Sequence, residues 1–223
     1  MSASAQAVKV VVVGSNGVGK TSLCCAYADG RVPSELPDVS LPKTLSKRVE
    51  GKELSVALYD TDGTRTKDVN RVRPLQYENA NVFLVCYSLA SPASLQSVRK
   101  WVSEVAAHCP GVPVVLVGCQ SDRRTKLENG EKEEAQKEEE EDGEGEEEEK
   151  AAEEVRADKV GAVSKEEGEA MAREVKACAL VECSAVEKAG LNDVFGEAYR
   201  AIFHGNKSGS SSKSSGERRC LFM

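Results

Sequence analysis

Long hydrophobic stretches are missing from this sequence. No run reaches about 18 apolar residues, which is the length that a membrane-spanning helix needs. The first residues lack a basic stretch followed by an apolar one, so we expect no secretory signal peptide. Position 2 is Ser2 rather than glycine, which excludes N-myristoylation.

The eight cysteines include no C-x-x-C pair, and this absence disfavours a zinc site. Because no signal peptide is expected, a disulfide framework is disfavoured as well, and we predict a reduced, cytoplasmic protein. Five of the cysteines lie in apolar patterns that are typical of buried free thiols: Cys24, Cys25, Cys86, Cys119 and Cys183.

The net charge of −7 is distributed unevenly along the chain. Residues 128–154 hold 16 acidic residues and 3 lysines, so this segment carries −13 and the rest of the chain carries +6. The segment has no apolar periodicity, and its self-repulsion predicts an extended, disordered insert. Residues 205–223 are predicted to form a flexible tail. We therefore expect one folded domain at 8–204, interrupted by the acidic insert at about 128–154.

The stretch from Gly14 to Thr21 reads G-x-x-x-x-G-K-[ST], the phosphate-binding P-loop. Its glycines let backbone N–H groups point at a triphosphate, Lys20 adds a positive charge, and Thr21 offers a hydroxyl to Mg²⁺. The β-branched run before it predicts a buried strand, and the residues after it suit a helix whose N-terminal end also favours anions. We predict that the phosphates are bound by Gly14, Ser15, Asn16, Gly17, Val18, Gly19, Lys20, Thr21 and Ser22.

Apolar patterns predict the remaining helices and strands. A helix is expected from Ser91, with Pro92 as its first residue, and another from Ser164, where Glu167 completes a capping box. A further helix is expected at 192–203. The strands are expected at 8–13, 44–49, 54–59, 82–87, 114–118 and 179–183, with a tight turn at 50–53.

The segment Asp60-Thr61-Asp62-Gly63 fits D-x-x-G and ends a predicted strand, about 40 residues after the P-loop. In P-loop proteins this aspartate holds Mg²⁺, and the glycine N–H approaches the γ-phosphate. The position of the motif therefore favours a nucleotide site that contains Asp60 and Gly63.

The C-terminal Cys220-Leu221-Phe222-Met223 fits the C-a-a-X motif of farnesylated proteins. We predict that Cys220 carries a prenyl lipid. The tail from His204 has a net charge of +3 and no second cysteine. Because one lipid chain gives only reversible binding, we expect dynamic residence at a membrane.

Four stretches in this order resemble the Rho family of Ras-like small GTPases: the P-loop, the D-x-x-G segment, Arg71 to Tyr77 (RVRPLQY) and Glu182 to Ala185 (ECSA). The resemblance covers about residues 8–204 and the C-terminal motif. It implies an α/β fold with a mixed six-stranded sheet, helices on both faces, and a nucleotide at the carboxyl ends of the strands. The acidic segment lies where Rho proteins carry an inserted helix.

The resemblance also implies the ligands, which are GTP or GDP with Mg²⁺. Thr21 and Asp60 would lie at the metal, and Asp122 would select guanine over adenine. From the residues alone, a loop cap at Asp122 and a plain strand end at Ser184 and Ala185 remain as alternatives. The residues implied at the guanine are Cys119, Gln120, Asp122, Ser184 and Ala185.

The partners implied by the resemblance are effector proteins at two switch regions, residues 32–44 and 62–77. Exchange factors, GTPase-activating proteins and guanine-nucleotide dissociation inhibitors would act as regulators. We expect a monomer with no nucleic-acid partner, held on the cytoplasmic face of the plasma membrane by prenylated Cys220.

Three residues depart from the family at the place where GTP is hydrolysed. Thr64 stands where the family has the glutamine that orients the attacking water, and Asn16 stands where Ras and Rho proteins have a small glycine. Asp62 adds a carboxylate that should repel the γ-phosphate or compete as a metal ligand. We therefore predict that Thr64 is a defective replacement for the catalytic glutamine.

Other departures concern nucleotide binding. Cys119 replaces an asparagine and loses a polar tie to the P-loop, and Gln120 replaces a lysine and loses its charge. The Mg²⁺-binding threonine of switch I falls at Asp38 or Val39, and Val32 replaces an aromatic residue that packs on guanine.

Three functions are compatible with these residues, and a fourth, a nucleoside kinase, is disfavoured because nothing resembles a lid or a second substrate site. The first is a GTP-loaded switch that hydrolyses slowly, similar to the hydrolysis-deficient Rnd-type Rho proteins. The second is a normally cycling GTPase that tolerates the substitutions. The third is a pseudo-GTPase, an interaction module with little nucleotide binding. We expect the first, and a role in actin or cell shape follows from the resemblance alone.

Overall fold

The computed structural model describes residues 5–35, 42–64, 66–127 and 161–205. Six strands form one sheet in the order β2-β3-β1-β4-β5-β6. Only β2 runs antiparallel to its neighbour, and all other neighbouring pairs are parallel. The strands are β1 (Gln6–Gly14), β2 (Lys43–Val49), β3 (Lys52–Asp60), β4 (Val82–Ser88), β5 (Val114–Cys119) and β6 (Ala179–Glu182). The predicted mixed six-stranded α/β fold is therefore confirmed.

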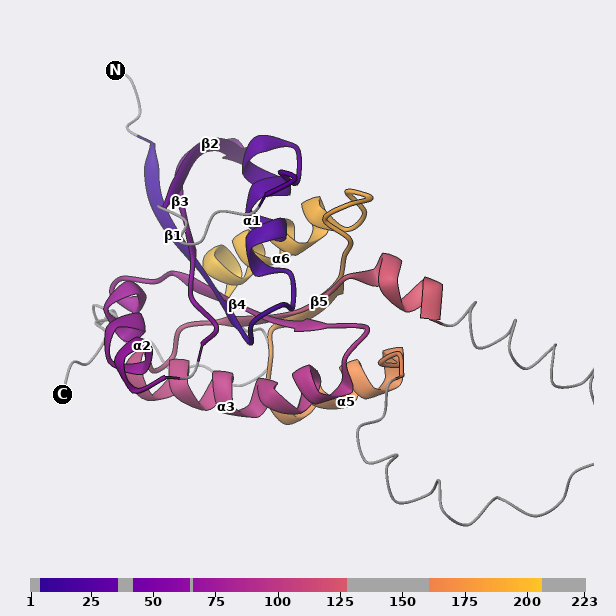
Figure 1. Ribbon diagram of the computed structural model, residues 1–223. Helices are drawn as coiled ribbons and strands as arrows, with labels where there is room; N and C mark the ends of the chain where they lie inside the picture. The colour runs from indigo at the N-terminus through magenta and orange to yellow at the C-terminus, as the bar shows by residue number, and fades with distance from the viewer. Residues whose placement is uncertain (1–4, 36–41, 65, 128–160, 206–223) are drawn as a thin grey trace, which may run out of the picture.

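Helices cover both faces of the sheet (Figure 1). On one face lie α1 (Lys20–Asp29) and α6 (Leu191–His204), and on the other lie α3 (Pro92–His108) and α5 (Lys165–Glu174). A short helix α2 (Lys67–Val72) and a 3₁₀ helix η1 (Arg73–Tyr77) follow β3. Residues 121–127 are also helical.

The valines of β1 divide the core into two halves, because successive side chains of a strand point to opposite faces. Val10 and Val12 pack with α1 and α6, whereas Val11 and Val13 pack with α3 and α5. All four are fully buried. The strand is therefore apolar on both faces from Val10 to Val13, which is why this part of its sequence is an unbroken run of valines.

The predicted helix starts agree with the structure. Ser91 caps α3 and accepts a hydrogen bond from the Ser94 N–H, with Pro92 as the first residue. The capping box of Ser164 and Glu167 is formed at the start of α5. The five cysteines predicted as buried free thiols are buried and free.

One expectation was wrong in detail, and three short helical segments were missed. The turn predicted at 50–53 contains only Glu50 and Gly51, both with positive φ, because Lys52 and Glu53 already pair in β3. Helix α2, η1 and the helix at 121–127 were not predicted, since these short segments lack an apolar stripe. The predictions for 128–154 and 206–223 lie outside the described residues.

The fold brings the predicted site residues to one edge of the sheet. The P-loop follows β1, Asp60 ends β3, Cys119 ends β5 and Ser184 follows β6, all at carboxyl ends of strands. This edge is where open α/β sheets bind ligands.

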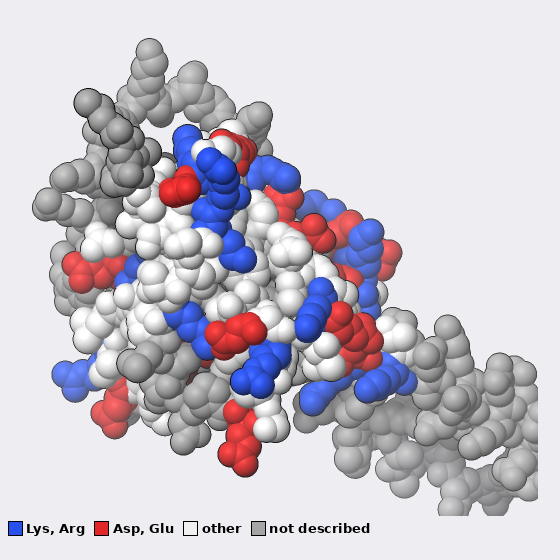
Figure 2. All heavy atoms as spheres, turned by 90° about the horizontal axis from the view of Figure 1, so that it is seen from above, with Lys and Arg blue, Asp and Glu red and all other residues white. Residues whose placement is uncertain are grey.

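Positive and negative side chains are interspersed on the face seen in Figure 2. Within the described ranges, no helix is both long and apolar enough to span a membrane.

Candidate nucleotide-binding site

The P-loop wraps around the buried side chain of Lys20. Its ammonium donates a hydrogen bond to the carbonyl oxygen of Ser15 at 2.8 Å, and the residue is only 6% exposed. Burial lowers the pKa of Lys20, because removal from water disfavours its charged form. A phosphate placed beside this cation would restore the interaction that burial removes.

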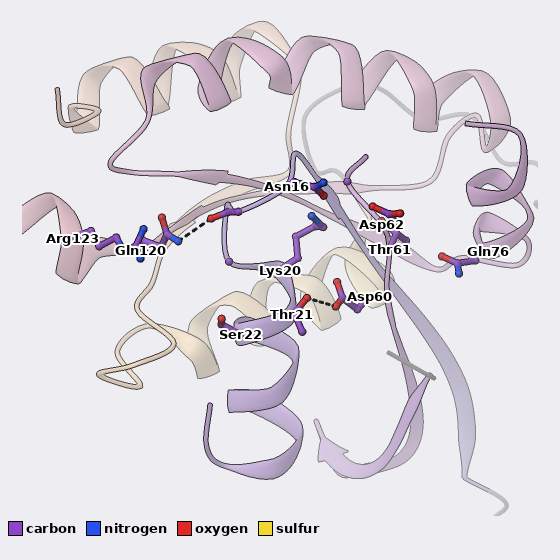
Figure 3. A pocket seen from close by; sticks show the side chains of 13 residues that line it. Asn16, Lys20, Thr21, Ser22, Asp60, Thr61, Asp62, Gln76, Gln120 and Arg123 are labelled. Carbon is purple, nitrogen blue, oxygen red and sulfur yellow. Dashed lines mark hydrogen bonds between the residues drawn. The ribbon is translucent and has the colours of Figure 1, made fainter. Parts of the chain in front are cut away.

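Thr21 and Asp60 meet at the bottom of the cavity. The Thr21 hydroxyl donates to Asp60 Oδ2 at 2.6 Å, as the dashed line in Figure 3 marks. A hydroxyl and a carboxylate are hard oxygen donors of the kind that Mg²⁺ prefers. The pair therefore fits the predicted magnesium site, where the ion would neutralise phosphate charge when bound.

Gly63 lies directly against the P-loop backbone. A Cβ atom at this position would come within 2.4 Å of the Gly14 carbonyl oxygen and within 2.7 Å of the Asn16 nitrogen. Only glycine allows this approach, so the D-x-x-G segment is fixed onto the phosphate loop. The predicted position of Gly63 beside the phosphates is compatible with this packing.

Two of the residues that depart from the family pattern touch each other. The Asn16 amide Nδ2 donates to the Thr64 hydroxyl oxygen at 2.8 Å. The Thr64 N–H in turn donates to Asp62 Oδ1 at 2.8 Å. Hydrogen bonds from Thr64 hold the pKa of the Asp62 carboxyl below its usual range, so this side chain is ionised at neutral pH.

Arg73 connects this segment to helix α3, which the sequence did not indicate. Its guanidinium donates to the carbonyl oxygens of Asp62 and Thr64 at 2.9 and 3.0 Å. It also pairs with Glu104 at 2.9 Å and lies over the ring of Trp101, 4.6 Å from the centroid. The R-x-R-P pattern around Arg73 was available in the sequence, but only as a mark of family resemblance.

The guanine end of the site is organised by Ser184. This fully buried residue donates from its hydroxyl to Asp122 Oδ1 at 2.6 Å, and its hydroxyl oxygen accepts the Glu187 N–H at 3.1 Å. The Ser121 N–H also donates to the Cys183 carbonyl oxygen at 3.2 Å. The two segments predicted to contact guanine therefore lie together.

Gln120 forms a hydrogen bond that connects the end of β5 to the P-loop. Its amide Nε2 donates to the Gly17 carbonyl oxygen at 3.0 Å, and its Oε1 accepts the Ser88 hydroxyl at 2.5 Å. Its left-handed backbone, with φ of 65°, turns the chain from β5 into the helix at 121–127. The polar bond to the P-loop that we expect Cys119 to lose is therefore matched by one from the neighbouring Gln120 amide.

The site contains two cavities that share a wall. The larger, of about 460 Å³, lies over the P-loop, and the smaller, of about 110 Å³, lies beside Asp122 and Ala185. The residues that line both are Gly19, Ser22, Gln120 and Arg123. The larger cavity is lined by P-loop residues and the smaller by residues predicted to contact guanine, so the two lie where the phosphates and the base of a nucleotide are expected.

Most predicted site residues line these cavities. The predicted nucleotide-site residues that do not line either cavity are Gly14, Ser15, Val18, Thr64 and Ser184. Sequence reasoning missed several lining residues, namely Thr61, Gln76, Arg123, Leu23, Cys183 and Val186. Arg123 directly follows the guanine-loop Asp122, and that adjacency was the one indication available.

A P-loop on a mixed sheet, with a D-x-x-G segment and a paired Asp122 and Ser184, defines a P-loop guanine-nucleotide-binding protein. The family model described as Ras family matches residues 9–204. The chain is 35% identical over 219 residues to the GTP-binding protein Rho1 of Kluyveromyces lactis, covering 96% of this chain and 94% of that protein. The chain thus belongs to the Ras family and is a Rho-like small GTPase.

Membership of this family implies binding of GTP and GDP with Mg²⁺ and a GTPase activity in general. It also implies effectors, exchange factors, GTPase-activating proteins and dissociation inhibitors as classes of partner.

Proposed function

We propose that this Rho-like switch holds Mg²⁺·GTP and hydrolyses it slowly, so that it remains GTP-loaded. The observation that supports this proposal is the 2.8 Å hydrogen bond between the Asn16 amide and the Thr64 hydroxyl. This bond joins Asn16, where a Ras-like enzyme needs free space, to Thr64, where it needs a side chain that orients the attacking water.

Hydrolysis in this family requires a glutamine that positions the attacking water. Thr64 is shorter than glutamine, and its hydroxyl oxygen already accepts a hydrogen bond from Asn16. The Asn16 side chain also occupies the place where an arginine supplied by a partner would enter. Such an arginine accelerates hydrolysis by about 10³–10⁵. Both effects slow hydrolysis, and they act on different parts of the machinery.

The groups that bind nucleotide are separate from these two residues. Lys20 is buried in the P-loop, and Thr21 and Asp60 are in contact. Asp122 is held by Ser184 at the base end. Binding of Mg²⁺·GTP is therefore supported independently of its hydrolysis.

The decisive experiment restores the family residues. Single-turnover hydrolysis of bound GTP should be slow in the unmodified protein and at least about tenfold faster in Asn16→Gly/Thr64→Gln, since a positioned catalytic group contributes about 10²–10⁴. The nucleotide released on denaturation should be GTP for the unmodified protein and GDP for the variant.

A matched control makes the same chemical changes elsewhere. Asn79 has a positive φ of 58° that glycine adopts freely, and Thr125 is exposed on the helix at 121–127. Asn79→Gly/Thr125→Gln should leave hydrolysis unchanged. A protein that binds GTP but shows no acceleration in the Asn16 and Thr64 variant would exclude this explanation. Fast hydrolysis by the unmodified protein would identify a normally cycling GTPase.

A pseudo-GTPase is favoured by one observation, the carboxylate of Asp62. This ionised side chain lines the phosphate cavity together with Lys20. Because it would lie near the γ-phosphate, repulsion opposes GTP binding. A purified protein that contains no nucleotide and binds none on addition would support this second function and exclude the first.

We also propose that the protein associates with the cytoplasmic face of the plasma membrane through a farnesyl group on Cys220. The support comes from the C-a-a-X ending and from the positive tail around it. A single lipid chain with a weak basic patch gives reversible binding.

A further inference from the structure

Arg123 lies at the junction of the two cavities and is exposed to both. It is among the four residues that line the larger and the smaller cavity, and it is the only charged one of the four. Figure 3 shows it beside Gln120, at the end of the site away from Asp62 and Gln76. Family resemblance did not place it in the site.

The backbone around Gln120 directs this side chain. The Arg123 N–H donates to the Gln120 carbonyl oxygen at 3.0 Å, which fixes the first turn of the helix at 121–127. Successive residues of a helix point in directions about 100° apart. Asp122 points to Ser184, and Arg124 pairs with Glu182 at 2.5 Å, so Arg123 is the one of these three residues that lines the larger cavity.

Among the described residues, no anion competes for the guanidinium of Arg123. In the described part of the chain it forms no ion pair and no side-chain hydrogen bond, whereas its neighbour Arg124 is held by Glu182. Lys20 supplies positive charge at the phosphate end, but Gln120 is neutral where the family has a lysine. The junction would therefore have no positive side chain if Arg123 were absent.

We propose that Arg123 binds the α-phosphate of the guanine nucleotide and replaces the positive charge that is missing at Gln120. This inference rests on the nucleotide binding in the proposed function. Lys20 and Thr21 hold the β- and γ-phosphates, and Asp122 holds the base. The ribose and the α-phosphate connect the base to the β- and γ-phosphates. They must therefore lie beside the residues that line both cavities, among them Arg123. A planar guanidinium is well suited to two parallel hydrogen bonds with phosphate oxygens.

The test compares ligands that differ in their phosphates. Guanosine, GMP and GDP are titrated against a fluorescent GDP analogue bound to the full chain, for the unmodified protein and for Arg123→Gln. The affinities for GMP and GDP should fall about three- to tenfold, because the lost charge-assisted contact is exposed to water, and that for guanosine should not change. Added salt should reduce the difference.

Two further variants separate the roles of charge and shape. Lys126→Gln removes a positive charge from the same helix at an exposed residue that lines neither cavity, and all three affinities should stay unchanged. Arg123→Lys keeps the charge but loses the paired donors, so its affinities should lie between those of the unmodified protein and Arg123→Gln.

An equal loss for guanosine and GDP would overturn the proposal, because it would mean that the guanidinium packs on the base instead. No loss for GMP and GDP would also overturn it. If the unmodified protein bound none of the three ligands, the proposed function would fail together with this inference. If the protein binds GDP but Asn16→Gly/Thr64→Gln does not accelerate GTP hydrolysis, the explanation for slow hydrolysis fails and the proposed role of Arg123 does not.

Discussion

At the scale of single residues, Tyr87 carries an unusual group, a buried hydroxyl without a hydrogen-bond partner among the described residues. The residue is fully buried, and burial raises the pKa of its phenol. Gly168 leaves room for it, since a Cβ there would lie 2.7 Å from the oxygen. An unsatisfied buried hydroxyl costs about 1–3 kcal/mol.

Replacement Tyr87→Phe should therefore stabilise the protein by about 1 kcal/mol, after allowing for the small void that the lost oxygen leaves. Urea unfolding followed by fluorescence measures the change. The matched control is Tyr77→Phe, because the Tyr77 hydroxyl donates to Glu104 at 2.8 Å and its loss should destabilise. A loss of stability in Tyr87→Phe would show that the hydroxyl is satisfied.

Single residues also show which parts of the site were predictable. Lys20, Thr21 and Asp60 line one cavity, and the sequence could indicate this because each belongs to a local motif at a strand end. The contact between Asn16 and Thr64 could not be predicted, since it joins positions 48 residues apart. A sequence gives both departures from the family but not their mutual contact, which depends on how Gly63 packs against the P-loop.

At the scale of elements, α2 and η1 are fixed to α3 through Arg73. This side chain is 2% exposed and bonds to Glu104, to two backbone carbonyls before α2, and to the face of Trp101. Trp101 also donates to the Ser15 hydroxyl at 3.2 Å. A chain of contacts therefore runs from the P-loop through α3 to the second switch region.

Replacement Arg73→Met keeps much of the volume but removes the charge. It should destabilise the protein by about 3 kcal/mol, because Glu104 loses its partner in a largely buried ion pair. Amide hydrogen exchange around Asp62 to Thr64 should become faster, since two carbonyl oxygens lose their donor. Both changes are measured on the same sample by urea unfolding and mass spectrometry.

The control for this experiment is Arg99→Met. Arg99 pairs with Glu174 at 2.5 Å, but both side chains are about half exposed. Exposed pairs contribute little, so the unfolding midpoint should not change measurably. Similar effects of the two replacements would contradict the view that Arg73 fixes the second switch region.

The same elements show where sequence patterns were sufficient. Strands such as β1 and β4, and helix α3 with its Ser91 cap, are encoded by apolar runs and local caps. Helix α2 spans only six residues, and its Thr66 cap bond is long, at 3.4 Å. Its conformation depends on the tertiary contacts of Arg73, which no local pattern contains.

At the scale of the whole molecule, the excess of negative charge comes from one segment. Residues 128–154 carry −13, and the rest of the chain carries +6. The described surface mixes both signs on the face seen in Figure 2. For the proposed membrane association, the basic charge that would act beside the lipid is therefore that of the tail from His204, with its net +3.

The farnesylated full chain should bind vesicles that contain phosphatidylserine, and added salt should weaken the binding, because lipid insertion and about 1 kcal/mol per basic residue act together. Cys220→Ser should abolish binding in a sedimentation assay. The matched control is Cys178→Ser, since Cys178 is a partly exposed thiol of the folded part and its loss should change nothing. Binding that survives Cys220→Ser, or that ignores salt, would contradict a farnesyl anchor assisted by the tail. Equal binding to neutral and anionic vesicles would leave the lipid as the sole anchor and remove the role of the basic residues.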